Sequence, residues 1–175
     1  MPDDPTPGLP GRVLAIDPGE RWIGLALSDD ERRLGLPLTT IDRKSLPHGG
    51  PKRREAVAIA DAIRDAIAPD QPNIVVVGVP LRPDGTADDQ AASFQHLGER
   101  IAAALDLPVA LQNERRSNPA EAPVTADRTR KGGALNPAKK RRDREKRHAL
   151  AAATILQRWL DAQVAPGLTD PLPHP

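Results

Sequence analysis

The sequence contains no cysteine, very few aromatic residues and no long apolar run. Without cysteine there is no disulfide, no thiol nucleophile and no cysteine-ligated zinc, which is typical of proteins in a reducing compartment. The aromatic residues are Trp22, Phe94 and Trp159, so stacking of nucleobases on aromatic side chains cannot dominate any recognition. No apolar run has the length of a membrane span, and the N-terminus lacks the pattern of a signal peptide. We therefore expect a cytoplasmic protein with no membrane association.

Basic residues are concentrated in one part of the chain, although the formal net charge is only +1. From Arg128 to His148 the sequence contains ten Lys or Arg and two acidic residues. Such a block repels itself and commonly binds a polyanion, so we predict that residues 115–142 form a mobile basic loop in contact with nucleic acid. The alternative is a solvated loop that leads into a charged helix.

The length of 175 residues suits one ordinary domain. Residues 1–11 and 164–175 are rich in proline and glycine and poor in apolar residues, so we predict two flexible tails. The domain itself is expected to span residues 12–163.

The apolar periodicity predicts three strands followed by a helix, a strand, a helix, a strand and a helix. The strands are expected at Arg12–Ile16, at Trp22–Ser28, within Arg32–Ile41, at Asn73–Pro80 and at Pro108–Gln112, and the helices at Lys52–Ala68, Asp88–Leu105 and Asp143–Ala162. The first three strands can pair as an antiparallel meander, in which Pro37 favours an edge position for the third. Alternating helices and strands then indicate a mixed five-stranded sheet with helices on its faces. This α/β arrangement matches the ribonuclease H-like fold.

Asp17 follows the first predicted strand and begins the tripeptide Asp-Pro-Gly. Because this tripeptide is a strong turn signal, Asp17 has a simple interpretation as the cap of a hairpin. A second interpretation comes from Glu114, which follows the last predicted strand. If the first and last strands lie side by side, both carboxylates project from the carboxyl edge of the sheet, where sites in open α/β sheets gather.

Two carboxylates held close together at neutral pH require a cation between them. Mg²⁺ and Mn²⁺ prefer oxygen ligands, and such ions activate water and stabilise the leaving oxygen in phosphodiester hydrolysis. His148, in the first turns of the last predicted helix, is a candidate third member as a metal ligand or a proton carrier. Glu145 precedes it by three residues on the same helical face and is a further candidate. The alternative is that His148 is an exposed surface residue.

Four segments follow one another between Arg12 and Ala162: IDPGERWIGLALSD, VVVGVPLRPDGTADDQAASFQ, NERRSNPAEA and HALAAATILQRWLD. Together and in this order they resemble the YqgF/RuvX family, whose members are relatives of the RuvC Holliday-junction resolvases. The resemblance implies a ribonuclease H-like, metal-dependent nuclease that matures the 5′ end of the 16S ribosomal RNA precursor, or a junction-resolving DNA endonuclease.

The resemblance also implies site residues. The first acidic residue of the family falls on Asp17 and its glutamate on Glu114, so Asp17, Glu114 and His148 are the predicted catalytic and metal-binding residues. The sequence departs from the family at Asn113 and at His148, since aspartate is usual at both positions. We expect these departures to weaken Mg²⁺ binding and to favour Mn²⁺.

Phosphate contacts are expected from basic residues close to the predicted site. The candidates are Arg82, Arg115, Arg116, Lys131, Lys139, Lys140, Arg141 and Arg142. Such contacts provide affinity without sequence readout, so the sequence does not distinguish structured RNA from branched DNA.

Two other classes of function remain open at this stage. The departures at Asn113 and His148 allow a binding module that has lost catalysis. An ATP-binding domain of the actin and hexokinase type also opens with an Asp-x-Gly hairpin, but this chain is too short for the second domain of such enzymes. A monomer and a two-fold homodimer are both compatible with the sequence, because a junction resolvase acts on two symmetric strands.

Overall fold

The computed structural model describes residues 11–47, 51–68, 70–82, 86–114 and 137–164. In chain order the elements are β1 (Arg12–Pro18), β2 (Trp22–Ser28), β3 (Gly35–Asp42), the 3₁₀ turn η1 (Arg43–Ser45), α1 (Lys52–Ile67), β4 (Pro72–Val79), α2 (Asp89–Leu105), β5 (Val109–Asn113) and α3 (Pro137–Val164). Within these ranges the predicted number and order of strands and helices are confirmed.

The five strands form one mixed sheet in the order β3-β2-β1-β4-β5. Strand β2 pairs antiparallel with both β1 and β3, whereas β4 pairs parallel with β1 and β5. Strand β3 is an edge strand, as Pro37 predicts, and its pairing with β2 shifts register beside this proline. The first and last strands are not neighbours, because β4 lies between them. The expectation that β1 and β5 lie side by side is therefore wrong.

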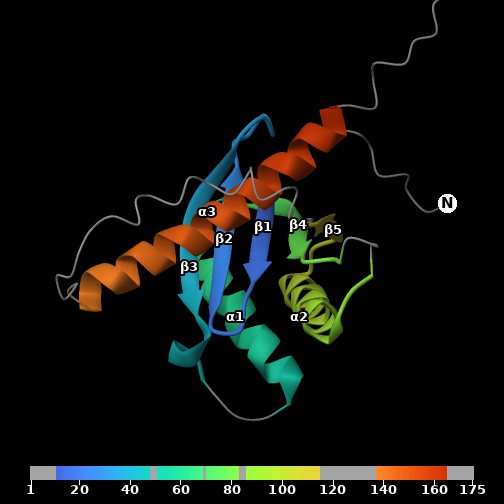
Figure 1. Cartoon of the computed structure of the whole chain (residues 1–175). Coiled ribbons are helices and arrows are strands. Elements are labelled where there is room, and N and C mark those ends of the chain that lie inside the picture. The colour runs from blue at the N-terminus through green and yellow to red at the C-terminus, as the bar shows by residue number, and fades with distance from the viewer. Residues whose placement is uncertain (1–10, 48–50, 69, 83–85, 115–136, 165–175) are drawn as a thin grey trace, which may run out of the picture.

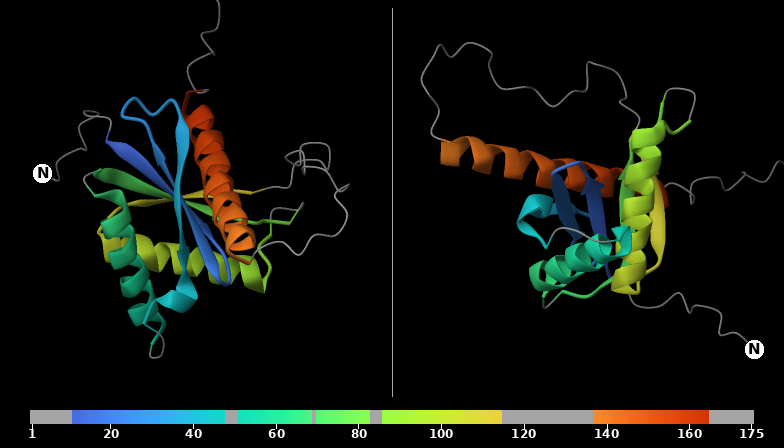
Figure 2. Two further views of the ribbon diagram at one scale, coloured as in Figure 1. Left: turned by 90° about the vertical axis from the view of Figure 1, so that its left-hand side faces the viewer. Right: turned by 90° about the horizontal axis from the view of Figure 1, so that it is seen from below.

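Helices cover both faces of the sheet (Figures 1 and 2). On one face, α1 and α2 pack against a core that includes Leu14, Ile16, Val75 and Val77. On the other face α3 packs against the alternate residues of the same strands, such as Ala15 and Val76. Because successive side chains of a strand point to opposite faces, this division tells which face each residue of the central strands occupies.

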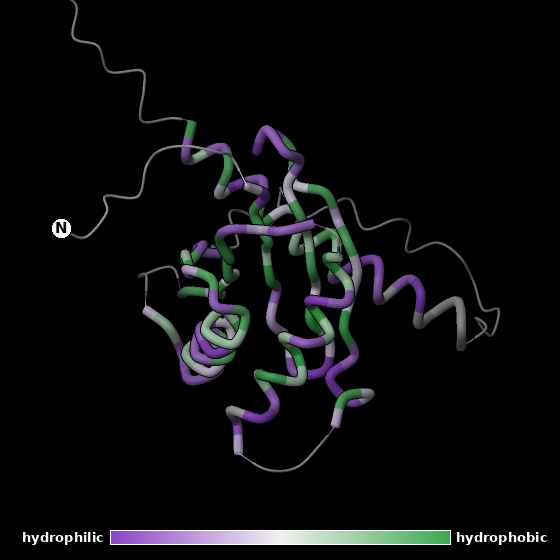
Figure 3. Tube along the Cα trace, turned by 180° about the vertical axis from the view of Figure 1, so that it is seen from behind, coloured by the Kyte–Doolittle hydropathy of each residue, from purple (hydrophilic) through white to green (hydrophobic). Residues whose placement is uncertain are grey.

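Helix α3 has 28 residues, so it is about 42 Å long and crosses the sheet diagonally (Figure 1). It begins at Pro137, six residues before the predicted start, so residues 137–142 belong to a helix and not to a loop. Proline is favoured in the first turn of a helix, and lysine and arginine are good helix formers. The N-terminal end of α3 projects beyond β3 (Figure 2), and the coloured turns of α3 that follow this end are mostly hydrophilic (Figure 3).

Two apolar residues that share the helical spacing of the buried positions are exposed. Leu150 is 55% exposed on α3, where Ala149 is buried instead, and Val57 is 42% exposed on α1, beside the buried Ala56. None of the helices in the described ranges is long and apolar enough to span a membrane.

Candidate active site

Asp17 lies inside β1, between two glycines on the neighbouring strands. It pairs with Gly24 of β2, and because Ile16 pairs with Val77, the residue beside Asp17 on β4 is Gly78. The side chain of Asp17 lies on the face covered by α3, where it approaches His148. Asp17 is thus a strand residue near the carboxyl end of β1 and not the cap of a hairpin, because Pro18 after it still pairs with Ile23 of β2.

Gly24 allows the backbone of α3 to approach the sheet at His148. A Cβ atom at position 24 would overlap the carbonyl oxygen of His148. His148 is the twelfth residue of α3, not part of its first turns, because the helix starts at Pro137. Its Nδ1 atom lies 4.0 Å from Oδ2 of Asp17, which is longer than a hydrogen bond. The imidazole and the carboxylate therefore face one another across a short gap.

Gly78 makes room for the carboxylate of Glu114. A Cβ atom at position 78 would overlap Oε1 of Glu114 and would lie 2.6 Å from Cδ1 of Ile155. Glu114 follows β5 directly, and its backbone N–H donates a hydrogen bond of 2.9 Å to the carbonyl oxygen of Val79. Its side chain consequently lies over β4 on the α3 face. The two carboxylates share the carboxyl edge of the sheet, as expected, but they do so across an intervening strand.

The two glycines were not among the predicted site residues. A signal for them exists in the sequence, because each interrupts an apolar strand, and a glycine inside a strand often marks the close approach of another group. For Gly24 this group is a helix backbone, and for Gly78 it is a carboxylate.

Burial changes the protonation of both members of the facing pair. Desolvation raises the pKa of Asp17 to about 6, and only 19% of its side chain is exposed. The pKa of His148 is lowered, first by desolvation and second by the nearby charge of Arg147. At pH 7 the pair therefore consists of a buried anion and a neutral imidazole, which is a combination that a divalent cation would stabilise.

The donor types suit Mg²⁺ or Mn²⁺, since two carboxylates and a neutral imidazole are all competent ligands. Two ligands of one such ion, each about 2.1 Å from it, are at most about 4.2 Å apart. The 4.0 Å separation of Asp17 and His148 falls within this limit. Over the described ranges, however, no three His, Cys, Asp or Glu side chains are grouped closely enough to hold a metal ion. Asp17 and His148 are the pair that the fold assembles, and Glu114 lies over the neighbouring strand.

Asn113 belongs to the opposite face of the sheet. It pairs with Val79, whose side chain lies in the core on the α1 and α2 side. Its Oδ1 atom is buried and accepts no hydrogen bond from the described part of the chain. An aspartate at position 113, which the resemblance implies for the family, would therefore add no carboxylate to the face that holds Asp17.

The turn between β1 and β2 is fixed from α1. The guanidinium of Arg43 donates a hydrogen bond of 2.7 Å to the carbonyl oxygen of Gly19, and it forms an ion pair with Glu55 of α1. Because Gly19 follows Asp17 by two residues, this contact restrains the end of β1 that carries Asp17.

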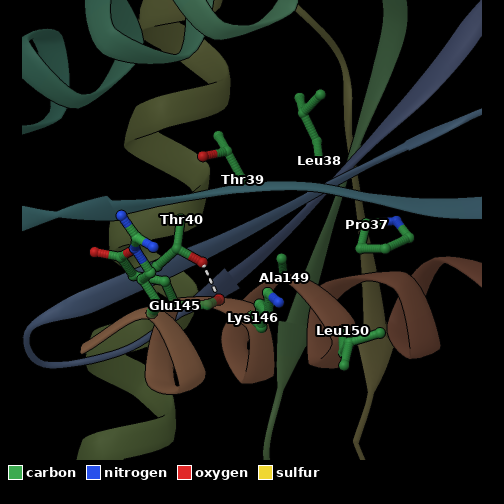
Figure 4. A pocket seen from close by; sticks show the side chains of 9 residues that line it. Pro37, Leu38, Thr39, Thr40, Glu145, Lys146, Ala149 and Leu150 are labelled. Atoms are coloured by element: carbon green, nitrogen blue, oxygen red, sulfur yellow. Dashed lines mark hydrogen bonds between the residues drawn. The ribbon is translucent and has the colours of Figure 1, made fainter. Parts of the chain in front are cut away.

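A groove of about 450 Å³ lies between β3 and the N-terminal half of α3 (Figure 4). Its wall includes Arg142 and Lys146, which are exposed. Glu145 also lines this groove, over β3, and so does not join the pair of Asp17 and His148.

Arg82 is exposed just beyond β4, where its backbone N–H donates a hydrogen bond of 2.8 Å to the carbonyl oxygen of Thr86.

The remaining predicted phosphate contacts are less fully defined. Lys139, Lys140 and Arg141 belong to α3, but their side chains are not among those described. Arg115, Arg116 and Lys131 lie outside the described residues.

Comparisons with known proteins agree with this architecture. Residues 11–162 match the family RuvX, described as Holliday junction resolvase. The chain is 36% identical over 154 residues to a "Putative pre-16S rRNA nuclease" of Roseiflexus sp. (strain RS-1), covering 88% of this chain and 96% of the relative. A protein of the same name from Chloroflexus aggregans is 38% identical over 154 residues, with the same coverage.

Among solved structures, this chain is similar to Thermus thermophilus RuvC in complex with Holliday junction substrate. The TM-score is 0.50 at 14% sequence identity, and the match covers 89% of this chain and 96% of the other. This likeness confirms the predicted ribonuclease H-like fold.

Proposed function

Since this chain belongs to the RuvX family, we propose that it is a cytoplasmic, divalent-metal-dependent nuclease that processes the 5′ end of the 16S ribosomal RNA precursor. The observation that carries the proposal is the buried carboxylate of Asp17, which faces His148 at 4.0 Å beside the glycine that accommodates Glu114. The names of the curated relatives support RNA as the substrate.

In this proposal Asp17 and His148 hold Mg²⁺ or Mn²⁺, and Glu114, which lies over the neighbouring strand, would complete the site when the ion binds. When bound, the ion would act as a Lewis acid that activates water and stabilises the negative charge that develops on the oxygens around phosphorus. Asp17 contributes an anion at pH 7, because its raised pKa of about 6 still lies below neutrality. His148 contributes a neutral nitrogen, since its pKa is lowered, and this nitrogen either ligates the ion or accepts a proton from the attacking water.

The protein around these groups restricts water and orients the side chains. Burial beneath α3 strengthens electrostatic interactions, because the local dielectric constant is lower than in bulk solvent. The missing side chains of Gly24 and Gly78 let the backbone of His148 and the carboxylate of Glu114 lie close against the sheet, so little reorganisation is needed when substrate binds. Arg82, Arg142 and Lys146 are exposed, and we propose that they contact the phosphates of the substrate.

The second candidate function is cleavage of branched DNA. It is supported by the description of the matching family and by the structural likeness to a junction resolvase. Phosphate contacts alone do not separate the two substrates, because both present a similar backbone charge.

The test is cleavage of three labelled substrates with Mg²⁺ or Mn²⁺: structured precursor RNA, single-stranded RNA and a four-way DNA junction. The variant Asp17→Asn serves as the matched control, because it keeps the size of the side chain and removes its charge. We expect metal-dependent cutting of the structured RNA that is lost in Asp17→Asn. Preferential cutting of the DNA junction would favour the second candidate. Binding without cutting in either ion would instead support a catalytically inactive binding module.

A further inference from the structure

The residues that pair with Asp17 across the sheet extend to the edge strand β3. Asp17 pairs with Gly24, and Gly24 pairs with Thr40. The hydroxyl of Thr40 donates a hydrogen bond of 2.6 Å to the backbone carbonyl oxygen of Glu145 (Figure 4). One helical turn further along α3, the carbonyl oxygen of His148 lies so close to Gly24 that a Cβ atom there would overlap it. A single turn of α3 is therefore fixed over two adjacent strands, next to the strand that carries Asp17.

We propose that Thr40 and Gly24 are positioning residues that set the separation of His148 from Asp17. The proposal deepens the function proposed above and rests on it for its kinetic consequences. The 4.0 Å gap is too long for a hydrogen bond, so the two side chains do not fix one another directly. Their separation instead follows from the placement of the α3 backbone on the sheet.

The contact at Thr40 has a counterpart on the other side of His148. The amide of Gln157 accepts a hydrogen bond of 2.9 Å from the backbone N–H of Gly35 and donates one of 3.0 Å to the carbonyl oxygen of Arg33. Helix α3 is thus held to β3 and to the residues just before it at two points, Glu145 and Gln157. His148 lies between these points and close to the first, so the contact at Thr40 has the stronger control over its position.

The bond from Thr40 does not support the helix itself. A carbonyl oxygen has two lone pairs, so Glu145 can accept from Thr40 while it also accepts the N–H of the residue four positions later. Removal of the hydroxyl leaves the helical hydrogen bonds intact and allows α3 to shift relative to β3. A shift of about 1 Å at a reacting group costs up to about 100-fold in rate.

The test compares Thr40→Val with two controls in the full-length protein. Thr154→Val removes a threonine hydroxyl that donates to a carbonyl of α3 itself, that of Leu150, at 3.0 Å. Thr40→Ser retains the hydroxyl. We expect Thr40→Val to lower kcat about 10-fold with KM within about twofold, whereas Thr154→Val retains the parental kcat and Thr40→Ser recovers most of it.

A second readout needs no activity and no metal. The chain has four histidines, so the imidazole signals in NMR spectra can be assigned by substitution. The His148 signals of the metal-free protein are expected to shift in Thr40→Val and to stay in place in Thr154→Val. If Thr40→Val lowers only the melting temperature and leaves kcat and the His148 signals unchanged, Thr40 has a structural role alone and the proposal fails. If the parent protein cuts nothing, the proposed function fails, yet the imidazole signals still decide the positioning.

Gly24→Ala provides an independent variant. It should displace the His148 signals more than Thr40→Val does, because its Cβ atom would overlap the His148 carbonyl oxygen. The matched control is Gly35→Ala, whose Cβ atom would lie 2.9 Å from the carbonyl oxygen of Ala153 on the same helix. Equal displacement of the His148 signals by both alanines would overturn the local control that we assign to Thr40 and Gly24.

Discussion

The carboxylate of Glu114 occupies the space that a side chain at position 78 would fill. Gly78 belongs to β4, which separates β5 from β1, so its missing side chain lets an acidic residue after β5 reach toward Asp17 on β1. The carboxyl edge of this sheet thus gathers acidic groups from strands that are not adjacent.

Gly78→Ala is expected to displace Glu114 and to lower the cleavage rate at least 10-fold, because the new methyl group overlaps Oε1. The measurements are the initial rate of cleavage and the rise in melting temperature on addition of Mn²⁺, which should shrink in the variant. Gly98→Ala is the matched control, since its Cβ atom would overlap the side chain of Val77 on the other face of the sheet. It should destabilise the protein while its response to Mn²⁺ stays parental. A parental rate in Gly78→Ala would show that Glu114 is not needed where it lies.

Asp17→Asn is expected to stabilise the metal-free protein at pH 7 while it abolishes cleavage. Burial raises the pKa of Asp17 from 3.8 to about 6, so the folded protein retains a proton that the unfolded chain has lost between these values. The free energy of unfolding therefore falls as pH rises from about 4 to about 6, and the loss is complete above that window. A shift of about two pKa units corresponds to a stabilising effect of at most about 3 kcal/mol for the substitution.

The measurement for this prediction is thermal unfolding of both proteins at pH 4 and at pH 7. The difference in melting temperature should be several degrees at pH 7 and should be small at pH 4. Asp65→Asn, at an exposed position of α1, controls for the general loss of one negative charge. A melting temperature for Asp17→Asn that is at or below the parental value at both pH values would contradict the burial penalty.

Metal preference is expected to depend on His148. Because an imidazole is a softer ligand than a carboxylate, the parent protein should reach half-maximal activity at a lower concentration of Mn²⁺ than of Mg²⁺. His148→Asp should improve the use of Mg²⁺, whereas His148→Asn, which adds no charge, should not. Titration of activity and of melting temperature with each ion measures this difference. Equal activity of the parent in both ions at low concentration would argue against the preference.

The basic face of α3, which consists of Arg142 and Lys146 beside the groove, is expected to determine the affinity for substrate and not the rate of the chemical step. The double substitution of Arg142 and Lys146 by alanine should weaken binding of structured RNA and raise KM, with kcat nearly unchanged, since both residues line the groove outside the pair of Asp17 and His148. Each phosphate contact that is lost should reduce the slope of log K against log salt by about 0.7 to 0.9. Arg158→Ala, at an exposed position in the C-terminal half of α3, is the matched control. An unchanged salt slope in the double variant would remove this face from the interface.

The periodicity of apolar residues determined the type and order of the strands and helices, because these depend on interactions between residues close in the chain. The same periodicity did not determine which apolar residues of the helices are buried, since Leu150 and Val57 are exposed. Helical spacing defines a stripe, but the rotation of the helix on the sheet decides which edge of that stripe is covered. The basic block was expected to remain a loop up to residue 142, although its lysines and arginines favour a helix from Pro137 onward.

The sequence by itself identified Asp17, Glu114 and His148 as candidates, since each stands at a strand end or in the last helix of a recognisable pattern. Only the tertiary structure decided how they are related. The parallel pairing of β4 with both β1 and β5 separates the two carboxylates by one strand. Alternation along β5 assigns Asn113 to the opposite face, and the crossing of α3 over Gly24 brings His148 to Asp17. These relations arise from contacts between residues far apart in the chain, and local sequence patterns do not encode such contacts.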